Sequence, residues 1–316
     1  MEANQTPEWA YPMSSLELGF FLSTVREVLK KMKAETISYI PDDNGVLRVK
    51  FPQIGVPTKL FLRDLAQGSA QVPMETWDAL IEGYVEKIAT AIKEGVANRG
   101  NLERNRLRTM VFTEDAMRSL EHQYVEDGID DGPVYRTIGG ELLEVLAIDQ
   151  QATVALALRS DLRTSGISAG EALSVARHNT YRQAVKNVDV GNENLRMMAI
   201  TDVDNYAASA LLWLEEVLGK DLPYGAIVGL PTRNLSIVHT MEDEQWTAAL
   251  AVMTFRNRNL YEKGPRSLSP DIYWVYDEMI YKIDIKLSHN NDIAELVLPQ
   301  EMVDVINTMG GGHDLD

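Results

Sequence analysis

Residues 226–239, with the sequence Ala-Ile-Val-Gly-Leu-Pro-Thr-Arg-Asn-Leu-Ser-Ile-Val-His, contain two apolar runs on either side of a polar turn. Short apolar runs that are rich in β-branched residues and bounded by turn residues are typical of adjacent β-strands. Apolar residues with helical spacing lie on both sides, at 206–218 and 243–261, and two further β-type runs within 272–285 predict a closing hairpin. Strands in runs with helices between them favour an α+β fold of mixed sheets and packed helices.

The N-terminal part of the chain has a pattern of its own. A Ser-x-x-Glu capping box at 14–17 opens an amphipathic helix, and an Asn-Gly turn within 36–51 separates two β-type runs. A third short run at 59–62 precedes a second amphipathic helix at 77–96. We therefore expect an αβββα unit over residues 1–98.

The rest of the chain divides into a linker, a larger unit and a tail. A chain of 316 residues suits two or three compact units, since domains commonly have about 100–150 residues. We predict an arginine-rich linker at 99–109, a mixed α/β unit at 110–309 and a loose tail at 310–316. The linker has no aromatic residue to stack on a base, so we interpret it as a solvated connection. Its arginines are Arg99, Arg104, Arg106 and Arg108.

The chain contains no cysteine. This excludes a disulfide framework, a thiolate nucleophile, a cysteine-ligated zinc ion and an iron–sulfur cluster. The formal net charge of −17 repels phosphate backbones and anionic membranes, so we expect no general nucleic-acid binding and no membrane binding. The same charge suits a protein partner with a basic surface.

No segment has the pattern of a leader, a membrane span or a nucleotide-binding loop. Residues 1–7 lack both a basic and an apolar region, and no apolar run approaches the roughly 18 residues of a membrane span. Neither Gly-x-Gly-x-x-Gly nor Gly-x-x-x-x-Gly-Lys occurs. We therefore expect a cytoplasmic protein without a cofactor.

Residues 166–170, Gly-Ile-Ser-Ala-Gly, match the Gly-x-Ser-x-Gly nucleophile elbow of α/β-hydrolases. Asp202 or Asp204, followed by His239, would complete the chain order Ser, Asp, His that those enzymes use. The candidate catalytic residues are therefore Ser168, Asp202, Asp204 and His239. A carboxylate and metal site around the last three is a second form of the hydrolase hypothesis.

The context of Ser168 favours a structural role instead. An elbow needs a strand that runs directly into the turn, whereas residues 159–165 are predicted to form a polar loop. Ser168 also precedes Glu171 by three residues, which is the spacing of a capping box. Because helix capping also explains Asp202 and Asp204, the sequence favours a protein that is not an enzyme.

Neither the carboxylates nor the histidines have the spacing of a local metal site. The acidic loop at 126–131 lacks the EF-hand pattern and its distal glutamate. No two of the five histidines have the close spacing of a zinc motif. We interpret His239, at the end of an apolar strand, as a histidine of the core or its rim, and we predict no metal site.

Several motifs together resemble a bacterial family of unknown function that is typified by the YtpQ protein of bacilli. They are Ser-Ala-Gly-Glu-Ala-Leu at 168–173, Asp-Asn-Tyr-Ala-Ala-Ser-Ala-Leu-Leu at 204–212, the paired strands at 225–235 and the proline loop at 264–270. The segment at 60–65 is similar in outline. The resemblance implies no catalytic residue, because the family has no assigned activity, and it implies an ordinary capped helix at Ser168.

Three hypotheses on function follow. The first is a non-enzymatic cytoplasmic protein that binds a macromolecular partner, with Arg233, Asn234 and Arg266 as candidate contact residues. The second is a hydrolase that uses Ser168 or the carboxylate and metal site described above. The third is an acidic inhibitor or immunity-type protein that presents carboxylates to a basic nuclease or toxin.

Overall fold

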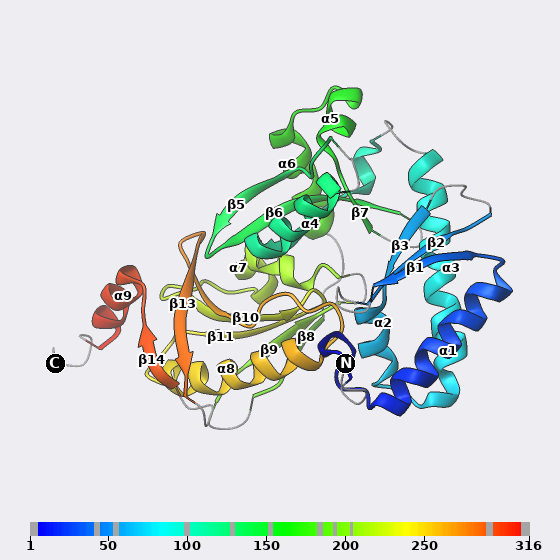
Figure 1. The fold of residues 1–316 in the computed structure, drawn as a ribbon. Coiled ribbons are helices and arrows are strands. Elements are labelled where there is room, and N and C mark those ends of the chain that lie inside the picture. The colour runs from blue at the N-terminus through cyan, green and yellow to red at the C-terminus, as the bar shows by residue number, and fades with distance from the viewer. Residues whose placement is uncertain are drawn as a thin grey trace. The chain divides into compact units, whose positions relative to one another are not determined.

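The computed structural model describes residues 6–40, 45–52, 57–97, 102–126, 130–150, 154–181, 186–191, 195–202, 205–288 and 293–310. The chain divides into two compact units (Figure 1). The first contains Met1–Asn101, Asp149–Ala155 and Lys263–Pro265, and the second contains Leu102–Ile148, Leu156–Glu262 and Arg266–Asp316.

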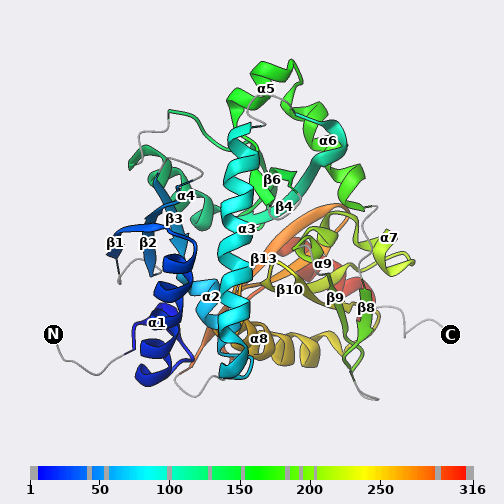
Figure 2. The same cartoon turned by 90° about the vertical axis from the view of Figure 1, so that its right-hand side faces the viewer.

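The first unit is a three-stranded antiparallel sheet with two long helices that pack side by side, α1 and α3 (Figures 1 and 2). Its described elements are η1 (Glu8–Ala10), α1 (Ser15–Lys31), β1 (Glu35–Ile40), β2 (Val46–Lys50), β3 (Pro57–Phe61), α2 (Leu62–Ser69), η2 (Met74–Thr76) and α3 (Trp77–Ala97). The predicted capping box is present, with Ser14 and Glu17 bonding to each other's backbone amides. Phe21, Phe51 and Trp77 are fully buried in the core of this unit. The short helix α2 was not predicted.

The elements that follow residue 101 alternate between helices and strands. They are η3 (Arg104–Arg106), β4 (Leu107–Thr113), α4 (Glu114–Glu126), β5 (Tyr135–Gly139), β6 (Leu142–Asp149), β7 (Val154–Leu156), α5 (Arg159–Ser165), α6 (Ala169–Tyr181), β8 (Lys186–Asp189), β9 (Met198–Thr201), η4 (Ala207–Trp213), α7 (Leu214–Leu218), β10 (Ala226–Thr232), β11 (Leu235–Thr240), α8 (Trp246–Lys263), β12 (Ile272–Tyr276), β13 (Met279–Leu287), β14 (Ile293–Val297) and α9 (Gln300–Gly310). The α+β fold class is thereby confirmed.

One long sheet organises the second unit. Its strand order is β4-β6-β5-β13-β12-β10-β11-β9-β8, and β14 pairs with β13. Most pairs are antiparallel, but β5 and β13 run parallel and are joined through a single register pair, Gly139 with Ile280. The sheet is therefore two antiparallel ribbons that meet at one point.

Both faces of the sheet are covered in the region of β10. Ala226, Val228 and Leu230 pack into the same core as η4 and α7, whereas Ile227 packs into the core that contains α8 and α9. Figures 1 and 2 show α8 running along the strands of this ribbon. Burial on both faces explains why the two runs of 226–239 are almost continuously apolar.

The structure corrects two sequence predictions. Leu107 to Thr109 do not belong to a linker, because they open β4, where Thr180 Oγ1 accepts a hydrogen bond from the amide of Thr109 at 2.9 Å. Residues 159–165 form helix α5 rather than a loop. Asp131 accepts a hydrogen bond from the amide of Ser160, in the first turn of α5. The N-terminus of this helix is therefore stabilised by a residue distant in sequence.

Among the residues that the structure describes, no helix combines the length and the apolar character that crossing a membrane requires.

A substitution at Gly139 tests the importance of the junction between the two ribbons for stability. Gly139 has a φ of +100°, and an added Cβ would collide with the backbone oxygen of Ile280. We expect Gly139→Ala to lower the free energy of unfolding by more than about 1 kcal/mol, measured by urea denaturation. The matched control is Gly170→Ala in α6, which has open space around its Cα and should stabilise the protein by up to about 1 kcal/mol. Equal effects of both substitutions would contradict the expectation.

Candidate functional site

A cleft of about 1190 Å³ opens in the second unit where the two ribbons of the sheet meet. Its lining comes from β5, the N-terminal part of β13, the turn between β12 and β13, the η4–α7 segment and one residue of α6. Two arginines, four carboxylates and several apolar side chains share this lining. Concave sites with a few convergent polar groups are the usual places for ligand binding, so this cleft is the candidate site.

The two arginines of the cleft are held by one buried carboxylate. Glu144, in β6, has a side-chain exposure of 0%. Its Oε2 accepts hydrogen bonds from Arg136 Nε at 2.6 Å and from Arg177 Nη2 at 2.9 Å. Its Oε1 accepts hydrogen bonds from Arg177 Nε at 2.7 Å and from Thr109 Oγ1 at 2.9 Å. Every bond is short and charge-assisted; the two-point contact fixes the plane of the Arg177 guanidinium, and one bond anchors Arg136 at Nε.

This arrangement leaves one positive charge unmatched at the wall of the cleft. Two guanidinium groups face one carboxylate, and their side chains remain 48% and 36% exposed for Arg136 and Arg177. Each guanidinium has five N–H donors, of which Arg136 uses one on Glu144 and Arg177 uses two. The remaining donors are available to an anion in the cleft.

The acidic part of the lining comes from two places. Glu215 and Glu216 lie in the first turn of α7, where negative charge is favoured, and Glu215 Oε1 accepts a hydrogen bond from the amide of Leu222 at 2.8 Å. Asp277 and Glu278 form the two-residue turn between β12 and β13, with φ angles of +48° and +62°. Such a turn favours Asn-Gly, so two acidic side chains occupy strained backbone at the rim of the cleft.

The apolar part of the lining is aromatic and aliphatic. Trp213 lies in the wall and packs edge-on against Tyr181, with ring centroids 6.1 Å apart. Leu211 and Ile280 contribute side chains that also belong to the core under η4. The wall is therefore continuous with packed structure and keeps its shape without a ligand.

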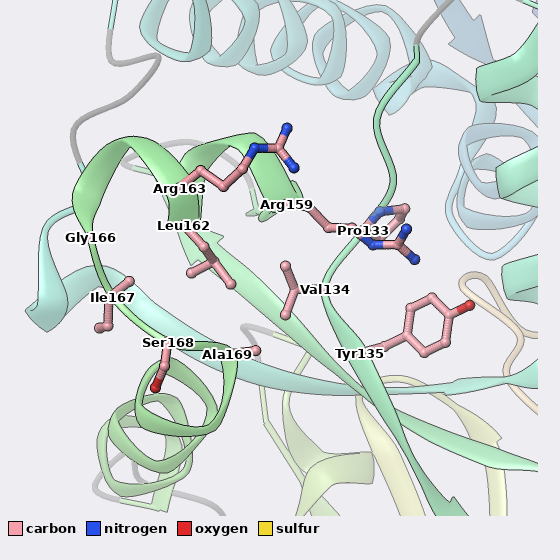
Figure 3. Close-up of a pocket in the computed structure, with 10 residues that line it drawn as sticks. All are labelled: Pro133, Val134, Tyr135, Arg159, Leu162, Arg163, Gly166, Ile167, Ser168 and Ala169. Atoms are coloured by element: carbon pink, nitrogen blue, oxygen red, sulfur yellow. The ribbon is translucent and has the colours of Figure 1, made fainter.

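Ser168 lies at a second, smaller cavity of about 660 Å³. Figure 3 shows its hydroxyl directed away from Arg159 and Arg163, with Val134 and Leu162 between them. The Oγ accepts a hydrogen bond from the amide of Glu171 at 3.2 Å, as expected of a residue that caps α6. The segment before it is helix α5, so the strand that an elbow requires is missing.

The structure does not bring Asp202 and His239 together. Asp202 accepts hydrogen bonds from the amides of Asn205 and Tyr206 at 2.9 and 2.6 Å, and its own amide donates to Asn234 O. His239 lies five positions farther along the chain than Asn234, within β11, or roughly 16 Å at 3.3 Å per residue. This separation is too long for a catalytic pair. Asp204 lies outside the described residues.

His239 is a buried core histidine with a backbone partner. Its exposed fraction is 4%, and its Nδ1 lies 2.7 Å from the carbonyl oxygen of Arg196. Because a carbonyl oxygen only accepts, Nδ1 is the donor of this hydrogen bond. His239 shares a face of β11 with Ile237, which belongs to the core under α8.

The predicted contact residues Arg233, Asn234 and Arg266 lie together around the turn between β10 and β11. The amide of Arg233 donates to Arg266 O at 3.1 Å, and Thr232 Oγ1 donates to Asn234 Oδ1 at 2.8 Å. The guanidinium of Arg233 lies over the ring of Phe112 at 4.4 Å. None of the three contact residues lines either cavity, and their described bonds join parts of the fold to one another.

The acidic loop is described only in part. Asp131 accepts hydrogen bonds from the amides of Gly132 and Ser160 at 2.9 and 3.0 Å. Burial opposes ionisation of this carboxyl, but the hydrogen bonds from Ser160 and Gly132 outweigh it and hold its pKa below the ordinary value. Residues 127–129 lie outside the described part, and the described residues contain no group of three side chains suited to a metal ion.

Sequence reasoning missed the arginine pair. The available signal was Glu144 itself, a lone carboxylate within the apolar run of β6. A charge in such a run must be paired, because leaving it unpaired in the core is costly. The run does not say which arginines pair with it, since Arg136 and Arg177 lie on other elements.

Ser168 provides a test of the capping role. We expect Ser168→Ala to lower the free energy of unfolding by about 1 kcal/mol, because one amide at the start of α6 loses its acceptor. Ser168→Asp, which restores an acceptor, should recover most of that loss in urea denaturation. A stability unchanged by Ser168→Ala would contradict the role.

A second prediction concerns the buried carboxylate of Glu144 and its partner Arg177. We expect Arg177→Ala to cost about 3 kcal/mol of unfolding free energy, because it removes two of the bonds that compensate the buried Glu144. The control is Lys286→Ala, which breaks an exposed pair with Glu295 and should cost less than about 1 kcal/mol. If thermal or urea unfolding showed similar losses of unfolding free energy for Arg177→Ala and Lys286→Ala, the charge of Glu144 would have to be compensated by groups other than Arg177.

Comparisons of the chain with models of protein families, with curated proteins and with solved structures found no match. The resemblance to the family typified by YtpQ stays a prediction from the sequence motifs.

Proposed function

We propose that this protein acts in the cytoplasm as a non-enzymatic binding protein, and that its cleft holds a basic and apolar segment of a polypeptide partner. The observation that carries the proposal is the chemistry of the lining. Four carboxylates, from Glu215, Glu216, Asp277 and Glu278, border an apolar wall that contains Trp213. Lysine or arginine side chains of a partner complement the carboxylates, and apolar side chains complement the apolar wall.

The shape of the cleft favours an extended chain as its occupant. Residues 136–139 of β5 all line the cleft, although neighbouring side chains of a strand point to opposite faces. Four consecutive lining residues therefore indicate that the edge of β5 borders the cleft. In the described register β5 pairs with β13 only at Gly139, so this edge is available for an added strand.

The overall charge supports the same proposal. A net charge of −17 attracts a basic partner over distances of about one Debye length and raises its rate of association. An inhibitor of a basic nuclease or toxin is one form that such a function takes. The hydrolase hypothesis has less support, because among its described candidates Ser168 caps α6, Asp202 bonds to two backbone amides and His239 bonds to a backbone carbonyl.

Binding of a labelled peptide tests the proposal. The probe is an octapeptide of alternating lysine and leucine with fluorescein at its N-terminus, measured by fluorescence anisotropy. We expect saturable binding that weakens roughly tenfold in the triple variant Glu216→Gln, Asp277→Asn and Glu278→Gln, because three complementary charges are lost. Asparagine and glutamine preserve side-chain size, and asparagine tolerates the positive φ at 277.

The matched control removes three exposed carboxylates of the first unit: Glu8→Gln, Glu75→Gln and Glu86→Gln. Its net charge equals that of the cleft variant, so it should bind the peptide within about twofold of the wild type. Equal weakening in both variants would show that binding reflects net charge rather than the cleft. No saturable binding to the wild type would refute the proposed function.

A further inference from the structure

We infer that Arg136 and Arg177 receive the C-terminal carboxylate of the bound segment, an inference that rests on the proposed function. The starting point is a mismatch in the cleft. A basic segment complements the four carboxylates of the rim, but the two guanidinium groups in the same cleft would repel it. An anionic group on the segment, placed at the arginines, removes this repulsion.

The geometry of the arginines fits such a group. Glu144 holds Arg177 at two points, Nε and Nη2, and anchors Arg136 at Nε. Both arginines line the cleft, and their side chains keep 48% and 36% exposure, so N–H groups not used by Glu144 remain for a ligand. Arginine donors that are already oriented bind a planar carboxylate with little loss of side-chain entropy.

The charge of the arginine cluster favours a carboxylate over a phosphoryl group. Two guanidinium groups and Glu144 leave one unmatched positive charge, which a monoanionic carboxylate neutralises. A phosphoryl group carries about −1.5 to −2 charges at neutral pH and would add excess negative charge beside the acidic rim. The arginine cluster within the cleft is therefore complementary to a carboxylate.

The position of the acidic turn favours a chain end with basic residues just before it. In the parallel register, Gly139 of β5 lies opposite Ile280 of β13, so the turn at 277–278 lies near the end of β5 that carries Arg136. A chain end held at Arg136 places the two or three preceding residues within about 7–10 Å of it. Basic side chains at those positions reach Asp277 and Glu278.

Three forms of the octapeptide separate this inference from the proposed function. The first ends in a free carboxylate, the second in a neutral amide, and the third is an amide whose last residue is glutamate. We expect the free acid to bind wild-type protein at least tenfold more tightly than either amide, because it alone makes charge-assisted hydrogen bonds at the chain end. Trp213 emission should change on binding, since this residue lines the cleft.

The advantage of the free acid should disappear in Arg136→Gln. This variant keeps the two-point contact between Arg177 and Glu144, so it should fold, and circular dichroism checks that it does. The readout is the ratio of the dissociation constants of the free acid and the plain amide, compared between this variant and the wild type. The control Arg118→Gln removes an exposed arginine of α4 in the same unit and should retain the preference for the free acid.

The outcomes are distinct. If the plain amide binds as tightly as the free acid, and the rim variant still weakens both, the carboxylate inference fails and the proposed function stands. If the glutamate amide matches the free acid, the arginines take a side-chain carboxylate and the chain end is not the occupant. If none of the three peptides binds, the proposed function fails together with this inference.

Discussion

The second unit depends on one buried carboxylate. Glu144 joins β4 through Thr109, β5 through Arg136 and α6 through Arg177, so a single side chain ties together three elements that meet around β6. A carboxylate without exposure to water is stable only when its oxygens are fully bonded, and here four hydrogen bonds converge on it. The hydrogen bonds that compensate the buried Glu144 of β6 also hold the guanidinium groups of Arg136 and Arg177 in the wall of the cleft. Structure and candidate function therefore share one residue.

Three polar side chains also bond to the outer edge of β4 at its beginning. Asn179 donates to Leu107 O, Thr180 accepts from the amide of Thr109, and Ser209 donates to Thr109 O. An edge strand otherwise presents unpaired backbone groups that recruit other strands. The first three residues of this edge are satisfied within the unit, whereas the edge of β5 borders the cleft.

Local patterns predicted the elements with strong periodicity. The capping box at Ser14, the paired strands β10 and β11 and the long helices α1, α3 and α8 follow from signals within about 20 residues. Helix α5 was missed because it has few apolar residues and begins at a contact with Asp131. Glu144 marked a buried charge, but its partners come from positions 109, 136 and 177, and no local spacing connects them. The cleft could not be predicted for the same reason, since it forms only where those segments meet.

The single register pair between Gly139 and Ile280 has a consequence for the order of folding. Each ribbon contains hairpins whose strands are neighbours in sequence, such as β5 with β6 and β12 with β13. Gly139 and Ile280 are roughly 140 residues apart in sequence, so their pairing must close a long loop at a cost in chain entropy. Only one register pair forms between β5 and β13 to offset that cost. Contacts of high sequence separation form slowly. We expect the two ribbons to form first and the pairing of β5 with β13 to form last. The cleft, which lies where the ribbons meet, would then be the final part of the unit to assemble.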